Sequence, residues 1–156
     1  DAFWSEARAA LGHGFEALEP LSALRRGKER ISMPSDVASL CVRQAETLLA
    51  NPSAPPGSMA THDVLHFLSH AVVDAGLTAS DSEHLVEVLS ASISQTRTIQ
   101  TCSQGFLCFQ KIAELHPAAL RQQSAKVASA TTSALHILSD TLQQQRNRSA
   151  RSVLRE

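Results

Sequence analysis

The chain has 156 residues, of which 43% are hydrophobic and 4% are aromatic, and its formal net charge at pH 7 is −1. This length suits one domain with a sizeable core, and the shortage of aromatic residues favours close helix packing over a β-sheet core. The three cysteines form no CxxC pair, which argues against a disulfide framework or zinc finger and favours a reducing compartment.

The first predicted elements are helices separated by polar loops. Apolar residues at helical spacing predict a helix over residues 2–24, and the basic stretch 25–32 is expected to be a loop. The sequence Pro34-Ser35-Asp36 is typical of a helix start, and Asn51-Pro52 marks the end of this second helix. The stretch 51–57 (NPSAPPG) then predicts a loop.

Two further helices are predicted in the middle of the chain. The third covers Met59 to Ala75, and Gly76 follows it in the position favoured for a left-handed C-cap. Ser80 and Glu83 form a capping-box pattern, so the fourth helix is expected to open at Ser80.

The last third of the chain is also predicted to be helical. The fifth helix runs from about Thr101 to Leu115 and ends before Pro117. A long final helix from Ala118 to about Gln145 carries apolar and small residues at heptad-like spacing. It is expected to divide in two if residues 129–133 (SATTS) bend it. Residues 146–156 are expected to form a basic C-terminal tail.

The stretch THDVLHFLSH places His62, His66 and His70 at intervals of four residues. Histidines one helical turn apart can chelate zinc, but three ligands from one straight helix rarely converge on a tetrahedral ion. On a helical wheel they lie opposite the apolar residues of the same helix. A solvated face is favoured, a contact with a partner or RNA stays open, and no metal site is assigned.

Signals for catalysis are missing from the sequence. There is no GxSxG, GxxxxGK[ST], GxGxxG or HExxH motif. Cys41, Cys102 and Cys108 fall within apolar stripes and are interpreted as small core residues. We therefore assign no catalytic residue, no cofactor and no small-molecule substrate, and expect a protein that is not an enzyme.

The formal charge is polarised along the chain, at −4 over residues 51–100 (one basic and five acidic side chains) and +4 over residues 101–156 (seven and three). Clustered cations can neutralise phosphates, although basic tails are also ordinary solubilising ends. The basic residues form two patches, at residues 25–30 and 146–155. Neither patch contains an aromatic residue, so base stacking is not expected. The candidate RNA contacts are Arg25, Arg26, Lys28, Arg30, Arg146, Arg148, Arg151 and Arg155.

Residues 59–94 resemble a repeat unit of the organellar α-helical repeat proteins, the octotricopeptide and FASTK/RAP-type group. The resemblance implies a two-helix repeat in an organellar protein that contacts RNA or stabilises an RNA–protein assembly, such as a mitochondrial ribosome. Together with a second, degraded unit, the resemblance covers about half of the chain, and it includes no RAP domain. The residues that carry it are Met59, Asp63, Val64, Phe67, Leu68, Ala71, Gly76, Leu85 and Leu89.

We expect an all-α fold of antiparallel helical hairpins, stacked as a short α-solenoid or an irregular bundle over residues 1–145. The leading hypothesis is a structural, RNA-contacting subunit of a large assembly, located in the mitochondrial matrix or another organelle, otherwise in the cytoplasm. The alternative is a protein–protein scaffold without RNA contact, which uses the histidine face or the small-residue face of the last helix. No membrane span is expected, because no apolar run approaches the ~18 residues required.

Overall fold

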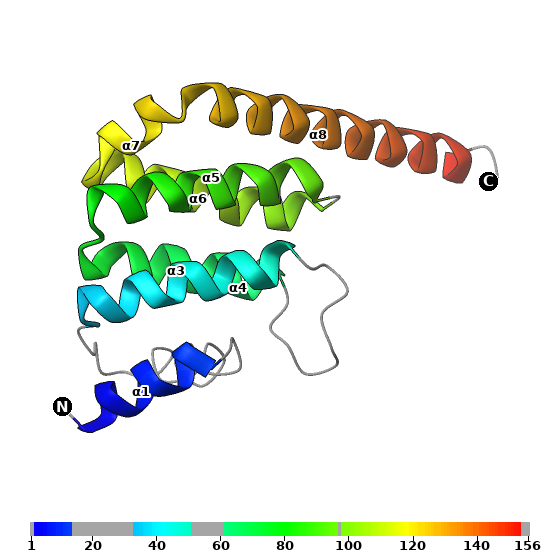
Figure 1. Cartoon of the computed structure of the whole chain (residues 1–156). Helices are drawn as coiled ribbons and strands as arrows, with labels where there is room; N and C mark the ends of the chain where they lie inside the picture. The colour runs from blue at the N-terminus through cyan, green and yellow to red at the C-terminus, as the bar shows by residue number, and fades with distance from the viewer. Residues whose placement is uncertain (1, 14–32, 51–60, 97, 154–156) are drawn as a thin grey trace.

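The computed structural model describes residues 2–13, 33–50, 61–96 and 98–153. Every element within these ranges is a helix, which confirms the predicted all-α class. Figure 1 shows the helices in layers, with α1 at one end and α8 at the other. From bottom to top of the figure, the layers are α1 (Ala2–His13), α3 (Ser35–Ala50) with α4 (Thr61–Phe67), α5 (Ala79–Gln95) with α6 (Ile99–Leu115), and α7 (Pro117–Gln122) with α8 (Ser124–Val153).

Helix α5 lies at the centre of the described core and packs against α3, α6, α7 and α8. Its residues Leu85, Leu89 and Ile93 are completely buried. Burial of each such side chain favours folding by about 1.5–3 kcal/mol. At Gly105 the missing side chain lets α6 approach α5, because a Cβ atom there would lie 2.6 Å from Cδ1 of Ile93.

Polar contacts join α3 to its neighbours on both sides. Arg8 of α1 forms a salt bridge with Asp36 at the start of α3. On the other side, Ser39 donates a hydrogen bond to Asp81 of α5. The Nε2 atom of His84 lies 2.8 Å from Oε2 of Glu46. These contacts link α1 to α3 and α3 to α5 across the layers.

The start of α5 differs from the predicted capping box. Thr78 is the N-cap, and its hydroxyl accepts a hydrogen bond from the backbone N–H of Asp81 at 3.1 Å. The same hydroxyl donates to the Asp81 carboxylate at 2.8 Å. Ser80 already lies inside the helix, so the prediction is wrong by two residues. Both pairs, Thr78/Asp81 and Ser80/Glu83, have capping-box spacing, and the structure uses the earlier one.

The third predicted helix ends where expected but is not regular. After α4 the chain forms a π-helical turn, η2 (Leu68–Val72), and a 3-10 turn, η3 (Val73–Ala75). Gly76 follows with a φ of 80°, which confirms the left-handed cap. The wider π turn shifts side chains from their α-helical positions. Ser69, the second residue of η2, is buried, and its hydroxyl donates a hydrogen bond to the His66 carbonyl at 3.0 Å.

The final predicted helix is divided at Gln123, between α7 and α8, and not at residues 129–133. Helix α8 also continues past the predicted end at Gln145 as far as Val153. Residues 146–153, expected in a tail, are therefore helical. The predicted basic loop at 25–32, the loop at 51–57 and the N-terminal helix beyond His13 lie outside the described residues.

Candidate functional site

Helix α8 contacts the rest of the molecule along only part of its length. Val127, Ala134 and Ile137 pack against the core, and Ala130 is completely buried. Lys126 forms a salt bridge with Glu87 of α5, and this cation holds the pKa of the Glu87 carboxyl below its usual value. Every described side chain from residue 142 to residue 151 is exposed. Figure 1 shows this part of α8 extending beyond the ends of the helices beneath it.

A second row of residues on α8 is open to solvent except at Thr131, which is partly buried. Its members follow one another at alternating steps of three and four residues, the spacing of a coiled-coil contact line. Its central leucines are 61% exposed at Leu135, 43% at Leu138 and 56% at Leu142. We call this row the α8 seam, which consists of Ala128, Thr131, Leu135, Leu138, Leu142, Gln145 and Ser149.

The α8 seam lies beside the face that packs on α5. Ala134 and Thr141 each immediately precede a seam residue, and both are partly buried. One flank of the seam is therefore against the molecule, and the other flank, at Thr132 and Ser139, is exposed. This arrangement suits the packing of one further helix along α8, since regular leucine rows bury their surface against a facing helix.

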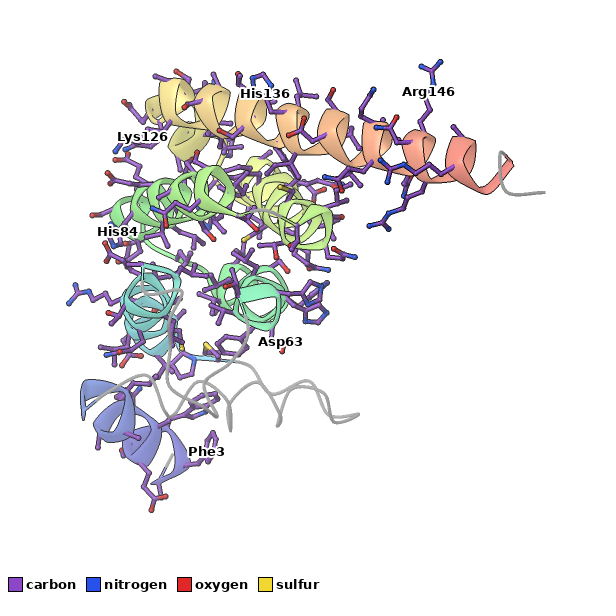
Figure 2. All side chains as sticks on the ribbon, turned by 90° about the vertical axis from the view of Figure 1, so that its right-hand side faces the viewer. Phe3, Asp63, His84, Lys126, His136 and Arg146 are labelled. Atoms are coloured by element: carbon purple, nitrogen blue, oxygen red, sulfur yellow. The ribbon has the colours of Figure 1, made fainter. Side chains whose placement is uncertain are left out.

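Three of the predicted RNA contacts, Arg146, Arg148 and Arg151, lie on the projecting part of α8, and all three are exposed. Steps of about 100° per residue place Arg146 and Arg148 on opposite flanks of the seam and Arg151 on the far side of the helix. In Figure 2 the Arg146 side chain points outward, away from the helices below α8. The three cations thus surround the helix end and do not form one face. Arg25, Arg26, Lys28, Arg30 and Arg155 lie outside the described residues.

The histidine row is located on the surface of α4 and η2, opposite Val64, Leu65 and Phe67, as the wheel predicts. His66 and His70 are exposed, with ring centroids 4.4 Å apart. His62 is partly buried, and its Nδ1 lies 3.7 Å from Oδ1 of Asp63. Within the described part of the chain, no three histidine, cysteine or acidic side chains are placed to hold a metal ion.

The cysteines are buried, as predicted. Cys41 and Cys108 are completely buried, and desolvation raises the pKa of each thiol to about 12. Cys102 is 7% exposed, and desolvation raises its thiol pKa as well. A nucleophilic cysteine needs a thiolate in an accessible, electropositive environment. The three thiols of this chain are buried, and their surroundings disfavour the thiolate.

An open pocket of 430 Å³ lies where the N-terminal ends of α3 and α5 meet. Asp36, Ser39, Arg43 and Thr78 are among its lining residues. The hydrogen bond from Ser39 lowers the pKa of the nearby Asp81 carboxyl, with a further contribution from Thr78. Because Asp36 and Asp81 already supply negative charge at the two helix starts, this pocket is less suited to an anion than its location suggests.

Comparisons of this chain with protein-family models, with curated proteins and with solved structures find no match. Among the described residues, no helix combines the length and apolar character needed to cross a membrane. The candidate site therefore depends on geometry alone. The α8 seam is the feature that sequence reasoning located only in part, since its heptad-like spacing is visible in the sequence but the exposure of its leucines is not.

Proposed function

We propose that this chain is a non-enzymatic subunit of a larger assembly and that α8 is its docking helix. The observation that carries the proposal is the exposure of Leu135, Leu138 and Leu142 in one regular row. Isolated exposed leucines are common on protein surfaces, but leucines in register along a helix form a continuous apolar strip. Such strips mark contact sites for other macromolecules.

The layered arrangement supports a finer form of this proposal, in which the helices are stacked hairpins of a short α-solenoid. In such proteins each layer contacts only its neighbours, and a terminal layer needs a polar outer face to stay soluble. Helix α8 forms the last layer with α7, which has only six residues. Among the described elements, the short α7 leaves most of α8 without a companion in its own layer. A helix from another subunit would complete that layer.

The test is fractionation of the native assembly from cells that express a tagged copy of the chain. The wild-type copy is expected in a large particle. A variant with Leu135, Leu138 and Leu142 changed to glutamine is expected in a small fraction, because glutamine removes the apolar strip from exposed positions. A matched control changes Ser129 and His136 to glutamine, which are exposed on another face of α8.

The control protein should remain with the large particle. Circular dichroism and a thermal melt establish that both variants are folded. If the leucine variant stays in the large particle as fully as wild type, α8 is not the docking helix. If wild type itself sediments as a single chain at low salt, the chain is not a subunit of an assembly.

RNA contact is the second candidate function, and the exposure of Arg146, Arg148 and Arg151 favours it. None of the three forms a salt bridge with a carboxylate in the described ranges. Three such cations can bind phosphates in a salt-dependent way. Helix α8 has no phenylalanine, tyrosine or tryptophan, so any binding would involve the backbone and not base stacking. With RNA contact, the mitochondrial matrix is the proposed location.

Treatment with ribonuclease separates the two candidates. An RNA-dependent particle should break down with ribonuclease and also lose this chain at about 0.5 M salt, where phosphate contacts are weak. A particle held by the leucines should survive both treatments, because hydrophobic contacts do not weaken with salt.

A further inference from the structure

Arg146 and Arg148 flank the C-terminal part of the α8 seam. Arg146 directly follows the seam residue Gln145, and Arg148 directly precedes the seam residue Ser149. In coiled coils these flanking positions form the salt bridges that determine partner choice. Both side chains are exposed. A helix packed along the seam would therefore meet one positive charge on each side.

The remaining flanking positions of the seam are uncharged. They hold small, apolar or hydroxyl side chains, and the acid of α8, Asp140, lies about 200° around the helix from Leu138. Two copies paired in parallel would bring their arginines together. Two copies paired antiparallel would set the arginines against residues 124–134, which contain no carboxylate. A second copy would match the apolar residues of the seam, but it would offer no carboxylate to Arg146 and Arg148.

Nucleic acid is a poor match for the same surface. Phosphates would pair with the arginines but would leave Leu135, Leu138 and Leu142 in water. One partner helix with apolar and acidic residues would cover the leucines and neutralise both flanking charges. We infer that the α8 seam binds an acidic amphipathic helix of another protein, with leucine-like residues at heptad spacing and glutamate or aspartate opposite Arg146 and Arg148. This inference rests on the proposed docking role of α8.

The probe for this inference is a designed helical peptide of about four heptads, with leucine at both core positions and glutamate at both flanking positions. A control peptide is identical except that lysine replaces each flanking glutamate. Binding of each labelled peptide to the full chain is measured by fluorescence anisotropy at low salt. The glutamate peptide is expected to bind roughly tenfold more tightly than the lysine peptide. The difference should shrink as salt is added.

Charge reversal at the seam provides the decisive comparison. The double variant Arg146→Glu and Arg148→Glu is expected to prefer the lysine peptide. The matched control Arg151→Glu changes a charge on the far side of α8 and should keep the wild-type preference. The variant Leu138→Gln and Leu142→Gln should lose binding of both peptides while its circular dichroism spectrum stays unchanged.

Equal binding of the two peptides to wild type would overturn the inference. It would also be overturned if Arg151→Glu altered the preference as much as the double reversal, because the attraction would then be general. A stable dimer of the isolated chain that Leu138→Gln dissociates would identify a second copy as the occupant and exclude the acidic helix.

These results are separable from the failure of the proposed function. One outcome is that changing the seam leucines to glutamine releases the chain from its native particle while the glutamate and lysine peptides bind wild type with equal affinity. In that case α8 is the docking helix and its partner is not acidic. If the same substitutions change neither the particle nor peptide binding, the docking role and the acidic partner are both excluded.

Discussion

Helices α5 and α8 both contain leucine and isoleucine at helical spacing, but these residues have different surroundings. In α5, Leu85, Leu89 and Ile93 have no exposed surface. In α8, Leu135 and Leu142 are each more than half exposed. The two helices differ in what lies next to them, since α5 is packed between layers and α8 has a layer of described residues on one side only. An apolar row of side chains therefore stabilises this fold in α5, where adjacent layers cover it, and not along the exposed side of α8.

The same comparison separates stability from interaction. A leucine inside α5 contributes to folding of the isolated chain, whereas a leucine of the α8 seam would contribute only when a partner is present. Substitutions to alanine distinguish the two cases, because they remove the same atoms from a covered and an uncovered site. The following experiments test this difference, beginning with the largest expected effect.

Leu89→Ala should lower the free energy of unfolding by about 2–5 kcal/mol, because it removes buried methyl groups and leaves a cavity. Leu89 is completely buried between layers. Urea denaturation followed by circular dichroism measures the change. A loss below 1 kcal/mol would mean that α5 is not as tightly packed as its burial indicates.

Gly105→Ala should lower the free energy of unfolding by about 1–2 kcal/mol, because the added Cβ meets the buried Ile93 side chain at 2.6 Å. Gly12→Ala is the matched control, since a Cβ there has no atom of the described residues within 4 Å beyond its own helix backbone. That control should be neutral or stabilising, as alanine favours helix. Adding Ile93→Ala to Gly105→Ala should show coupling, with the double variant more stable than the sum of the single changes predicts.

Asp81→Asn should lower stability by about 0.5–1 kcal/mol at neutral pH, because it weakens a helix cap that is partly open to water. Hydrogen bonds from Ser39 and Thr78 hold the Asp81 pKa below its usual value. The stabilising effect of the carboxylate is therefore complete above its unfolded-state pKa of about 3.9 and is lost as the pH falls through the lower folded-state pKa.

Urea denaturation of Asp81→Asn and wild type at several pH values measures this dependence. The difference in unfolding free energy should be constant from about pH 6 to 7 and disappear in strong acid. Glu83→Gln is the control, because no side-chain hydrogen bond or salt bridge joins Glu83 to another described residue. A pH-independent difference between Asp81→Asn and wild type would show that the charge of Asp81 does not stabilise the fold.

Local chemistry explains which parts of the fold could be predicted. The helix start at Pro34-Ser35-Asp36 and the left-handed cap at Gly76 depend on three residues and one residue, respectively, and both are confirmed. The π turn at Leu68–Val72 has no such signal, because its residues would fit a regular helix equally well. The division at Gln123 likewise depends on how α7 and α8 pack, and not on a glycine or proline at that position.

The candidate site could be predicted only in part for a related reason. Heptad-like spacing in the sequence identifies residues that share a face of α8, but it does not reveal what covers that face. Arg146 and Arg148 were expected in a tail, so their positions beside the seam were not foreseen. Both arginines lie beside the seam because α8 continues as a helix to Val153. Burial and helix length are both set by packing between distant segments.

Leu142→Ala should change the free energy of unfolding of the isolated chain by less than about 0.5 kcal/mol, because surface substitutions remove few contacts. Leu142 is 56% exposed and begins the stretch of α8, residues 142–151, in which every described side chain is exposed. Alanine also has the higher helix propensity. The measurement is the same urea denaturation as for Leu89→Ala. A loss near 2 kcal/mol would mean that another part of this chain covers the seam in solution. A negligible loss, together with release from the native particle, would mean that Leu142 contributes to binding and not to folding.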